Sequence, residues 1–303
     1  MLLLPSLALA LALAAPVQRP ARSGQEAYRR VVATALARAQ AGLASSVNLE
    51  VDHSRWEDPW VVTSANFQVR TTHSYGQAFE LAKNLEFMRG EFVRLLGEGR
   101  RPSGPAHIWV FPTMAEYNTF GGPYGEHSSI LGSFFATDQA ELPVATYYDG
   151  NWIQLGMWVT HSALHQFLAR EFGRTPDAWI DEGLASYFAL AWSWEYGASQ
   201  FAELAKARRL IPLERLLSDP IQAYVQRPHE RFIELGMLFR YLLEECEATK
   251  DDPNADPPRG PFRDFLRAAV RGEPLAQTEF AGIIASDADV LEEEFRAFDF
   301  SAW

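Results

Sequence analysis

The sequence has too little cysteine for a disulfide framework and too little positive charge for a nucleic-acid-binding surface. Its 303 residues include one cysteine, Cys246, which cannot form an internal disulfide bond. Lysine and arginine together number 27 against 39 aspartate and glutamate residues, which gives a formal net charge of −12. Because binding to nucleic acid or to anionic lipid requires clustered basic residues, we expect neither as a partner.

Long apolar runs are also scarce. Residues 1–15, MLLLPSLALALALAA, form an uncharged apolar stretch, which is shorter than the about 20 residues that a helix needs to cross a bilayer. Ala12 and Ala14 fit the small-residue pattern of a signal-peptide cleavage site. We therefore predict a cleaved signal peptide and a secreted or periplasmic protein. An uncleaved N-terminal membrane anchor is the alternative.

The remaining composition is that of a folded protein, with 48% hydrophobic and 22% charged residues. Periodicity predicts an α+β fold, with a mixed β-sheet in the first half and an α-helical second half. The expected strands are 47–51, 60–63, 67–71, 107–111, 130–136 and 144–148. The expected helices are 25–43, 74–96, 113–120, 155–172, 178–196, 212–217, 230–245, 261–270 and 290–298. We expect four parts: signal peptide 1–15, helix and strands 16–64, α/β lobe 65–172 and helical lobe 173–303.

Two histidines stand at a spacing that suits a metal ion. His161 and His165 are four residues apart in an expected helix, which places both imidazoles on one face. Two nitrogens so placed can bind one zinc ion. Glu182 opens the next expected helix, and an antiparallel return would bring its carboxylate to the same ion. The alternative is that the histidine pair only packs within the structure, with no metal.

The stretch from Trp158 to Phe188 resembles a known signature, HExxH followed by WxxEGLAxYF, of gluzincin-type zinc metallopeptidases. It is most similar to a peptidase-MA-like family of uncharacterised, mostly secreted bacterial proteins. The similarity covers about residues 65–300 and includes the TxxEYxxF pattern within 107–120. The resemblance implies a zincin-like fold, a zinc cofactor, and His161, His165 and Glu182 as the zinc ligands.

The chain departs from that signature at Ser162, where the family has the glutamate that serves as general base. A serine hydroxyl has no useful basicity near neutral pH, and loss of a general base lowers the rate by about 10²–10⁴. We therefore expect an exported, zinc-binding, metallopeptidase-like protein that is hydrolytically impaired and binds a peptide or protein segment in its cleft. One alternative is an active zinc peptidase that uses another base. The other is a metal-free structural or interaction module.

Several nearby residues could support or replace these groups. Ser186 lies four residues after Glu182 and could hydrogen-bond a ligand from outside the metal site. Tyr187 and Tyr241 could stabilise an oxyanion, whereas Phe232, where the family often has tyrosine, has no hydroxyl.

A substitute base is harder to find. Asp181 and Glu171 are close to the ligands in sequence, but regular helices would turn both away from the ligand face. His229 and Glu230 precede the helix expected behind the site, and we interpret both as solvated loop residues.

Overall fold

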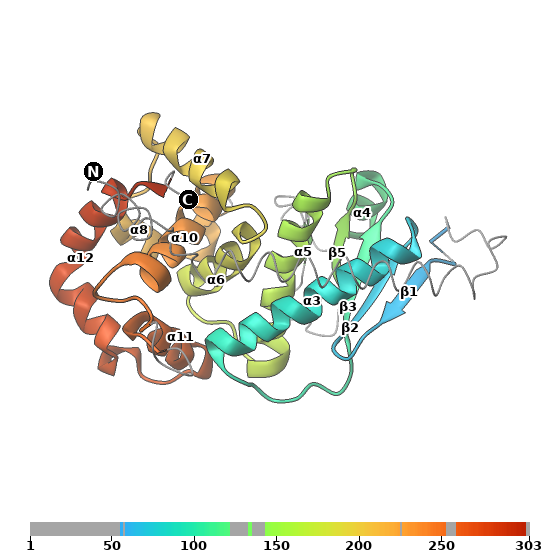
Figure 1. Cartoon of the computed structure of the whole chain (residues 1–303), viewed down its shortest axis with the longest axis horizontal. Helices are drawn as coiled ribbons and strands as arrows, with labels where there is room; N and C mark the ends of the chain where they lie inside the picture. Colours follow the sequence, from blue (N-terminus) through green and yellow to red (C-terminus); the bar gives the residue numbers. More distant parts are fainter. Residues whose placement is uncertain are drawn as a thin grey trace, which may run out of the picture. The chain divides into compact units, whose positions relative to one another are not determined.

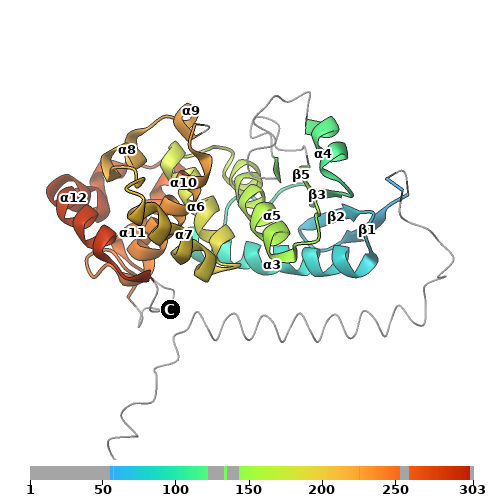
Figure 2. The same ribbon diagram turned by 90° about the horizontal axis from the view of Figure 1, so that it is seen from above.

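The chain divides into two compact units, Met1–Glu50 and Val51–Trp303, and only the second is described below. The computed structural model describes residues 55–56, 58–121, 133–134, 143–224, 226–252 and 259–300. The predicted signal peptide, the helix at 25–43 and the strand at 47–51 lie outside these residues. Figures 1 and 2 show the chain from two directions.

A mixed sheet organises the first half, with the strand order β1-β2-β3-β5-β4. The strands are β1 (Trp60–Thr63), β2 (Phe67–Thr71), β3 (Ala106–Phe111), β4 (Ser133–Phe134) and β5 (Val144–Tyr147). β2, β3 and β5 are parallel, while β1 and β4 pair antiparallel at the two edges. Within the described residues, the strands predicted at 60–63, 67–71, 107–111 and 144–148 are confirmed, and of the one expected at 130–136 the described residues form only β4.

Two helices pack on one face of this sheet. α3 (Tyr75–Leu96) connects β2 to β3, and α5 (Trp152–Phe167) follows β5. Their apolar faces meet every second residue of the strands, since alternate side chains of a strand point to the same face. The shared core is Val62, Phe67, Val69, Ala78, Leu81, Ala82, Leu85, Ala106, Ile108, Val110, Val144, Leu155, Val159 and Ala163. On the opposite face, Tyr117 of α4 (Met114–Gly121) packs with Phe111 and Ala145.

The second half is helical, as predicted, and the only described strand-like feature in it is one isolated bridge between Asp252 and Arg259. Its elements are the π-helical segment η3 (Leu168–Phe172), α6 (Ala178–Leu190), α7 (Trp194–Lys206), α8 (Leu213–Ser218), α9 (Ile221–Tyr224), α10 (Pro228–Arg240), the π-helical segment η4 (Tyr241–Glu245), α11 (Pro261–Arg271), the 3₁₀ turn η5 (Leu275–Gln277) and α12 (Glu279–Ala297). The chain therefore has an α+β fold with a mixed sheet.

Two predicted helix boundaries are wrong. The helix expected at 178–196 is two helices, because the Ser193 hydroxyl accepts the Tyr196 N–H and so starts α7 with its own N-cap. The helix expected at 290–298 begins earlier, at Glu279, where the Thr278 side chain accepts the Ala281 N–H.

α6 and α10 pack closely at a glycine. A Cβ atom added at Gly183 would lie 2.1 Å from a ring carbon of Phe239, so only a residue without a side chain permits this contact. This approach sets how far the start of α6 lies from α10.

A row of arginines joins α11 to the end of α3. Arg263 Nη1, Arg267 Nε and Arg271 Nη2 donate to the last three carbonyl oxygens of α3, at residues 94–96, over 2.9, 3.0 and 3.0 Å. These carbonyls have no partner within their own helix, and cationic donors there also complement the negative end of the helix dipole. The row therefore binds a helix of the sheet layer to the helical second half.

Among the described residues, no helix combines the length and the apolar character needed to cross a bilayer.

Candidate metal centre

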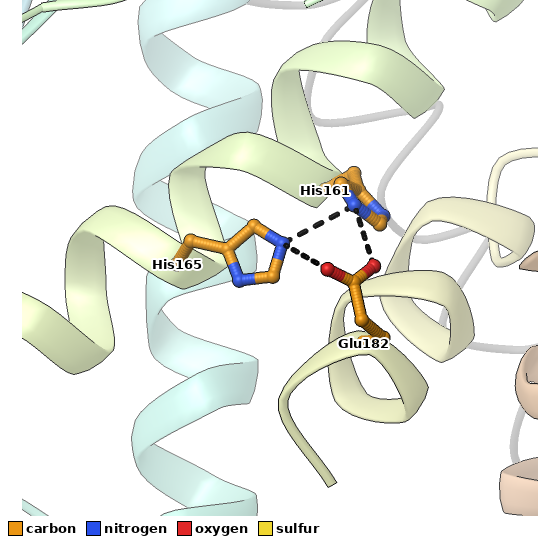
Figure 3. Close-up of side chains that lie close together, drawn as sticks. All are labelled: His161, His165 and Glu182. Atoms are coloured by element: carbon orange, nitrogen blue, oxygen red, sulfur yellow. Dashed lines mark hydrogen bonds and ion pairs between the residues drawn. The ribbon is translucent and has the colours of Figure 1, made fainter. Parts of the chain in front are cut away.

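Three side chains meet where α5 faces α6. His161 and His165 come from α5 and Glu182 from α6, and Figure 3 shows the two imidazoles converging on the carboxylate. The two histidine Nε2 atoms are 3.2 Å apart. Glu182 Oε2 lies 3.4 Å from His161 Nε2, and its Oε1 lies 3.9 Å from His165 Nε2. The predicted ligands are therefore brought together.

These separations suit one small cation. Two ligand atoms held about 2.0–2.1 Å from the same ion at a tetrahedral angle are about 3.3 Å apart. The observed separations of 3.2 Å between the two Nε2 atoms and 3.4 Å from His161 Nε2 to Glu182 Oε2 match that value, while His165 Nε2 lies 3.9 Å from the other carboxylate oxygen, Oε1. The cluster has the dimensions of a three-ligand site before any rearrangement.

Local sequence signals explain how α5 and α6 bring the ligands together. The Asn151 side chain accepts the Gln154 N–H and starts α5. The chain then reverses at Gly173, whose φ of 69° lies in the left-handed region that glycine favours. At the far end of α6, Trp192 Nε1 donates to Thr160 Oγ1 over 2.8 Å, which ties that end back to α5 directly before His161. Figures 1 and 2 both show α5 lying between the sheet and α6.

Asp181 holds one ligand from behind. Its Oδ1 lies 2.9 Å from His165 Nδ1, and both residues are largely enclosed. A carboxylate can only accept, so His165 carries its proton on Nδ1 and directs the Nε2 lone pair toward the cluster. Such a carboxylate–histidine pair orients the ring and raises its basicity as a ligand. Nothing in the spacing of Asp181 indicates this role, because helical periodicity turns it off the ligand face of α6.

Burial and charge act in opposite directions on the ligands. Burial lowers the pKa of His165, but the negative charges of Asp181 and Glu182 outweigh it and raise that pKa to about 9. Burial raises the pKa of Glu182, but the hydrogen bond from His161 and the charges of the two imidazoles outweigh it and lower that pKa. Without an ion, a proton on His165 therefore offsets part of the negative charge of the two carboxylates. A divalent cation must displace it.

Ser162 and Phe232, the two positions that the sequence singles out beside the ligands, supply no base. Ser162 is buried and follows His161 by about 100° around the helix. The ring of Phe232, from α10, lies with its centroid 5.8 Å from that of His161 and forms an apolar wall. Phe232 thus lies beside His161, and its ring carries no hydroxyl group.

The substitute bases considered from the sequence have other partners. Glu171 Oε1 accepts from Arg89 Nε and Nη2 over 2.9 and 2.7 Å. His229 Nε2 lies 3.3 Å from the Tyr196 hydroxyl. Glu230 is not a solvated loop residue as expected: it is buried in the first turn of α10 and forms ion pairs with two arginines.

The candidate supporting hydroxyls also lie elsewhere. The Tyr187 hydroxyl donates to Glu244 over 2.9 Å, and that of Tyr241 donates to Glu294 over 3.2 Å. The Ser186 hydroxyl is fully buried and has no hydrogen-bond partner in the described part of the chain. The observed support for a ligand therefore comes from Asp181.

The buried cluster of His161, His165 and Glu182 could hold a metal ion. Imidazole and carboxylate donors are compatible with zinc and with several other first-row divalent metals. No family model, no curated protein and no solved structure matches this chain.

Proposed function

We propose that this chain is an exported zinc-binding protein with a gluzincin-like metal centre in a zincin-like fold, whose hydrolytic step is impaired. The observation that carries the proposal is the convergence of two imidazole nitrogens, 3.2 Å apart, on the two oxygens of one carboxylate, at 3.4 and 3.9 Å, from two adjacent helices. The resemblance of residues 158–188 to the gluzincin signature supports zinc over other metals.

The chemistry of the donor set fits zinc. Two histidines and one glutamate form a known catalytic zinc ligand set, which leaves one coordination position open. Zinc in such a site supplies a Lewis acid that polarises a carbonyl group. The protein contributes the orientation of His165, held by Asp181, and an apolar wall at Phe232.

The impairment follows from the residues around the ligands. Hydrolysis needs a proton acceptor within hydrogen-bond reach of the attacking water, and Ser162 occupies the position of that acceptor in the family signature. Asp181 is committed to His165, and Glu171 to Arg89. The site is therefore suited to bind a peptide or protein segment more readily than to cleave it.

Metal analysis tests the first half of the proposal. Purified protein should contain about one zinc ion per chain, and His165→Ala should contain far less under the same purification. Wild-type protein that holds no metal, and gains no thermal stability when zinc is added, would favour the metal-free structural or interaction module instead.

Restoring the base tests the second half. Ser162→Glu should keep the zinc content of the wild type and acquire chelator-sensitive peptide hydrolysis, with a gain of up to about 10²–10⁴. Ser162→Gln is the matched control, because it has similar size without basicity. If wild-type protein already cleaves peptides as fast as Ser162→Glu, and chelator stops it, the chain is an active peptidase that uses another base.

A further inference from the structure

A cavity lies away from the metal cluster, at the amino ends of β2 and β3. It has a volume of about 260 Å³. Its walls are the loop 101–105, the first residues of the two strands, Arg89 of α3, and a face of α5 that continues into η3. Neither the resemblance nor the proposed zinc chemistry involves this cavity.

The cavity and the metal cluster use opposite sides of α5. At about 100° per residue, Ala163, Gln166 and Phe167 point about 140–240° away from His161 around the helix axis. All three line the cavity, whereas His161 and His165 face α6. A ligand in this cavity would not contact the metal ligands.

Positive charge dominates the polar lining, which includes three arginines and one glutamate. Arg89 is neutralised by Glu171, whose Oε1 accepts from both its Nε and its Nη2. Arg101 and Arg170 remain, which leaves an excess of about two positive charges, although the chain as a whole carries −12. Such a pocket attracts an anion that the rest of the surface would repel.

Neither of the two remaining arginines forms an ion pair with a carboxylate of the described residues, and both therefore contribute uncompensated positive charge. Arg170 is 6% exposed, and its Nη2 donates to the Gly104 carbonyl oxygen over 2.7 Å. Its Nε has no hydrogen-bond partner among the described residues. Arg101 is exposed at the rim and forms no ion pair or hydrogen bond with the part of the chain that the structure describes. Since a buried guanidinium without a counter-ion is unfavourable, an anion bound here would stabilise the site.

The other walls are apolar, which narrows the class of anion. Phe67 and Phe167 line the cavity, together with Pro102, Pro105 and Ala163. The volume is below the about 300–1,000 Å³ typical of pockets for drug-sized ligands. A planar carboxylate suits the fork of a guanidinium, and an apolar body suits the aromatic wall.

We propose that this cavity binds a small organic carboxylate, with Arg101 and Arg170 holding the carboxylate and the two phenylalanine rings contacting its apolar body. The carboxylate belongs either to a free organic acid or to the C-terminal residue of a peptide.

Calorimetric titration of the full chain with 3-phenylpropanoate tests this proposal. We expect saturable one-to-one binding, and no binding of the uncharged analogue 3-phenylpropanamide. N-acetylphenylalanine, a mimic of a peptide C-terminus, forms the second arm, and the tighter of the two carboxylates identifies the source. The same titration with His165→Ala should give an unchanged affinity, so a failure of the zinc proposal would not affect this one.

Arg101→Ala should weaken binding of 3-phenylpropanoate by about tenfold to a hundredfold, as expected for a lost hydrogen bond between charged groups. Arg259→Ala removes the same charge from an exposed arginine outside the cavity and should change nothing. Because Arg101 is exposed, its substitution should not disturb folding, whereas Arg170→Lys needs a melting curve beside the titration. The proposal would be overturned if 3-phenylpropanoate showed no saturable binding to the wild type, or if the amide bound equally well. It would also be overturned if Arg101→Ala and Arg259→Ala had equal effects on binding.

Discussion

The contact between Asp181 and His165 allows a sharp test of the metal centre. The 2.9 Å hydrogen bond fixes the proton on His165 Nδ1 and leaves Nε2 free as a ligand. Asp181→Asn keeps an acceptor oxygen at the same place but removes the negative charge. Asp181→Ala removes both and leaves the His165 Nδ1–H without its partner.

The two substitutions should form a graded series. Loss of an outer partner of a metal-ligating histidine typically lowers metal affinity by about 10–100-fold, which is about 1.4–2.8 kcal/mol of binding free energy. We expect Asp181→Asn to lower zinc affinity about tenfold, because the hydrogen bond survives, and Asp181→Ala to lower it about a hundredfold. The side chain of Asp181 is 6% exposed, so water cannot replace the lost contact easily.

Competition titration of zinc between the protein and a chelating dye measures this affinity. Asp177→Asn is the matched control, since Asp177 is an exposed residue preceding α6 whose side chain makes no capping hydrogen bond. Its zinc affinity should equal that of the wild type. Equal affinities for wild type, Asp181→Asn and Asp181→Ala, in folded proteins, would show that Asp181 does not support a zinc ligand.

Three further predictions concern buried residues of α6 and α10. Gly183→Ala would force a Cβ atom against Phe239 and should lower the unfolding free energy by about 1–3 kcal/mol, together with zinc affinity, as measured by urea unfolding and dye competition. Burial raises the pKa of Glu234 from 4.5 to about 8, although the hydrogen bond from the Ile211 N–H acts in the opposite direction. The contribution of the protonated Glu234 to stability is therefore full below about pH 4.5 and is lost as the pH rises through about 8. Glu234→Gln should flatten this part of the profile of melting temperature against pH. Ser186→Ala should leave zinc affinity unchanged, because its buried hydroxyl has no partner in the described structure, and a clear loss of affinity would instead support the predicted ligand contact.

The features that the sequence predicts well are set by neighbouring residues. α3 follows from its apolar spacing and from Ser74, whose side chain accepts the Gln77 N–H. The convergence of His161, His165 and Glu182 follows from a four-residue spacing and a short reversal. The signal lies within about one turn for α3 and for the histidine pair, and it extends across one short reversal to Glu182.

The features that it does not predict depend on contacts between distant segments. Asp181 supports His165 only because the two helices pack so that the far ring nitrogen meets it. The proposed carboxylate pocket needs Arg101 and Arg170 to line one cavity, although β3, α4, β4, β5 and α5 separate them in the sequence. The sequence does not predict the break between α6 and α7, because apolar residues continue through it while Ser193 acts as a cap.

The close approach at Gly183 has a consequence for how the protein is made. The three side chains of the cluster lie within residues 161–182, but Phe232, which lies beside His161, and Phe239, which packs against Gly183, follow 50 or more residues later in the chain. A nascent chain halted between these points would carry every donor atom without the scaffold that spaces them. Under the proposed zinc function, tight chelation therefore requires α10 as well as the two helices that carry the donor atoms.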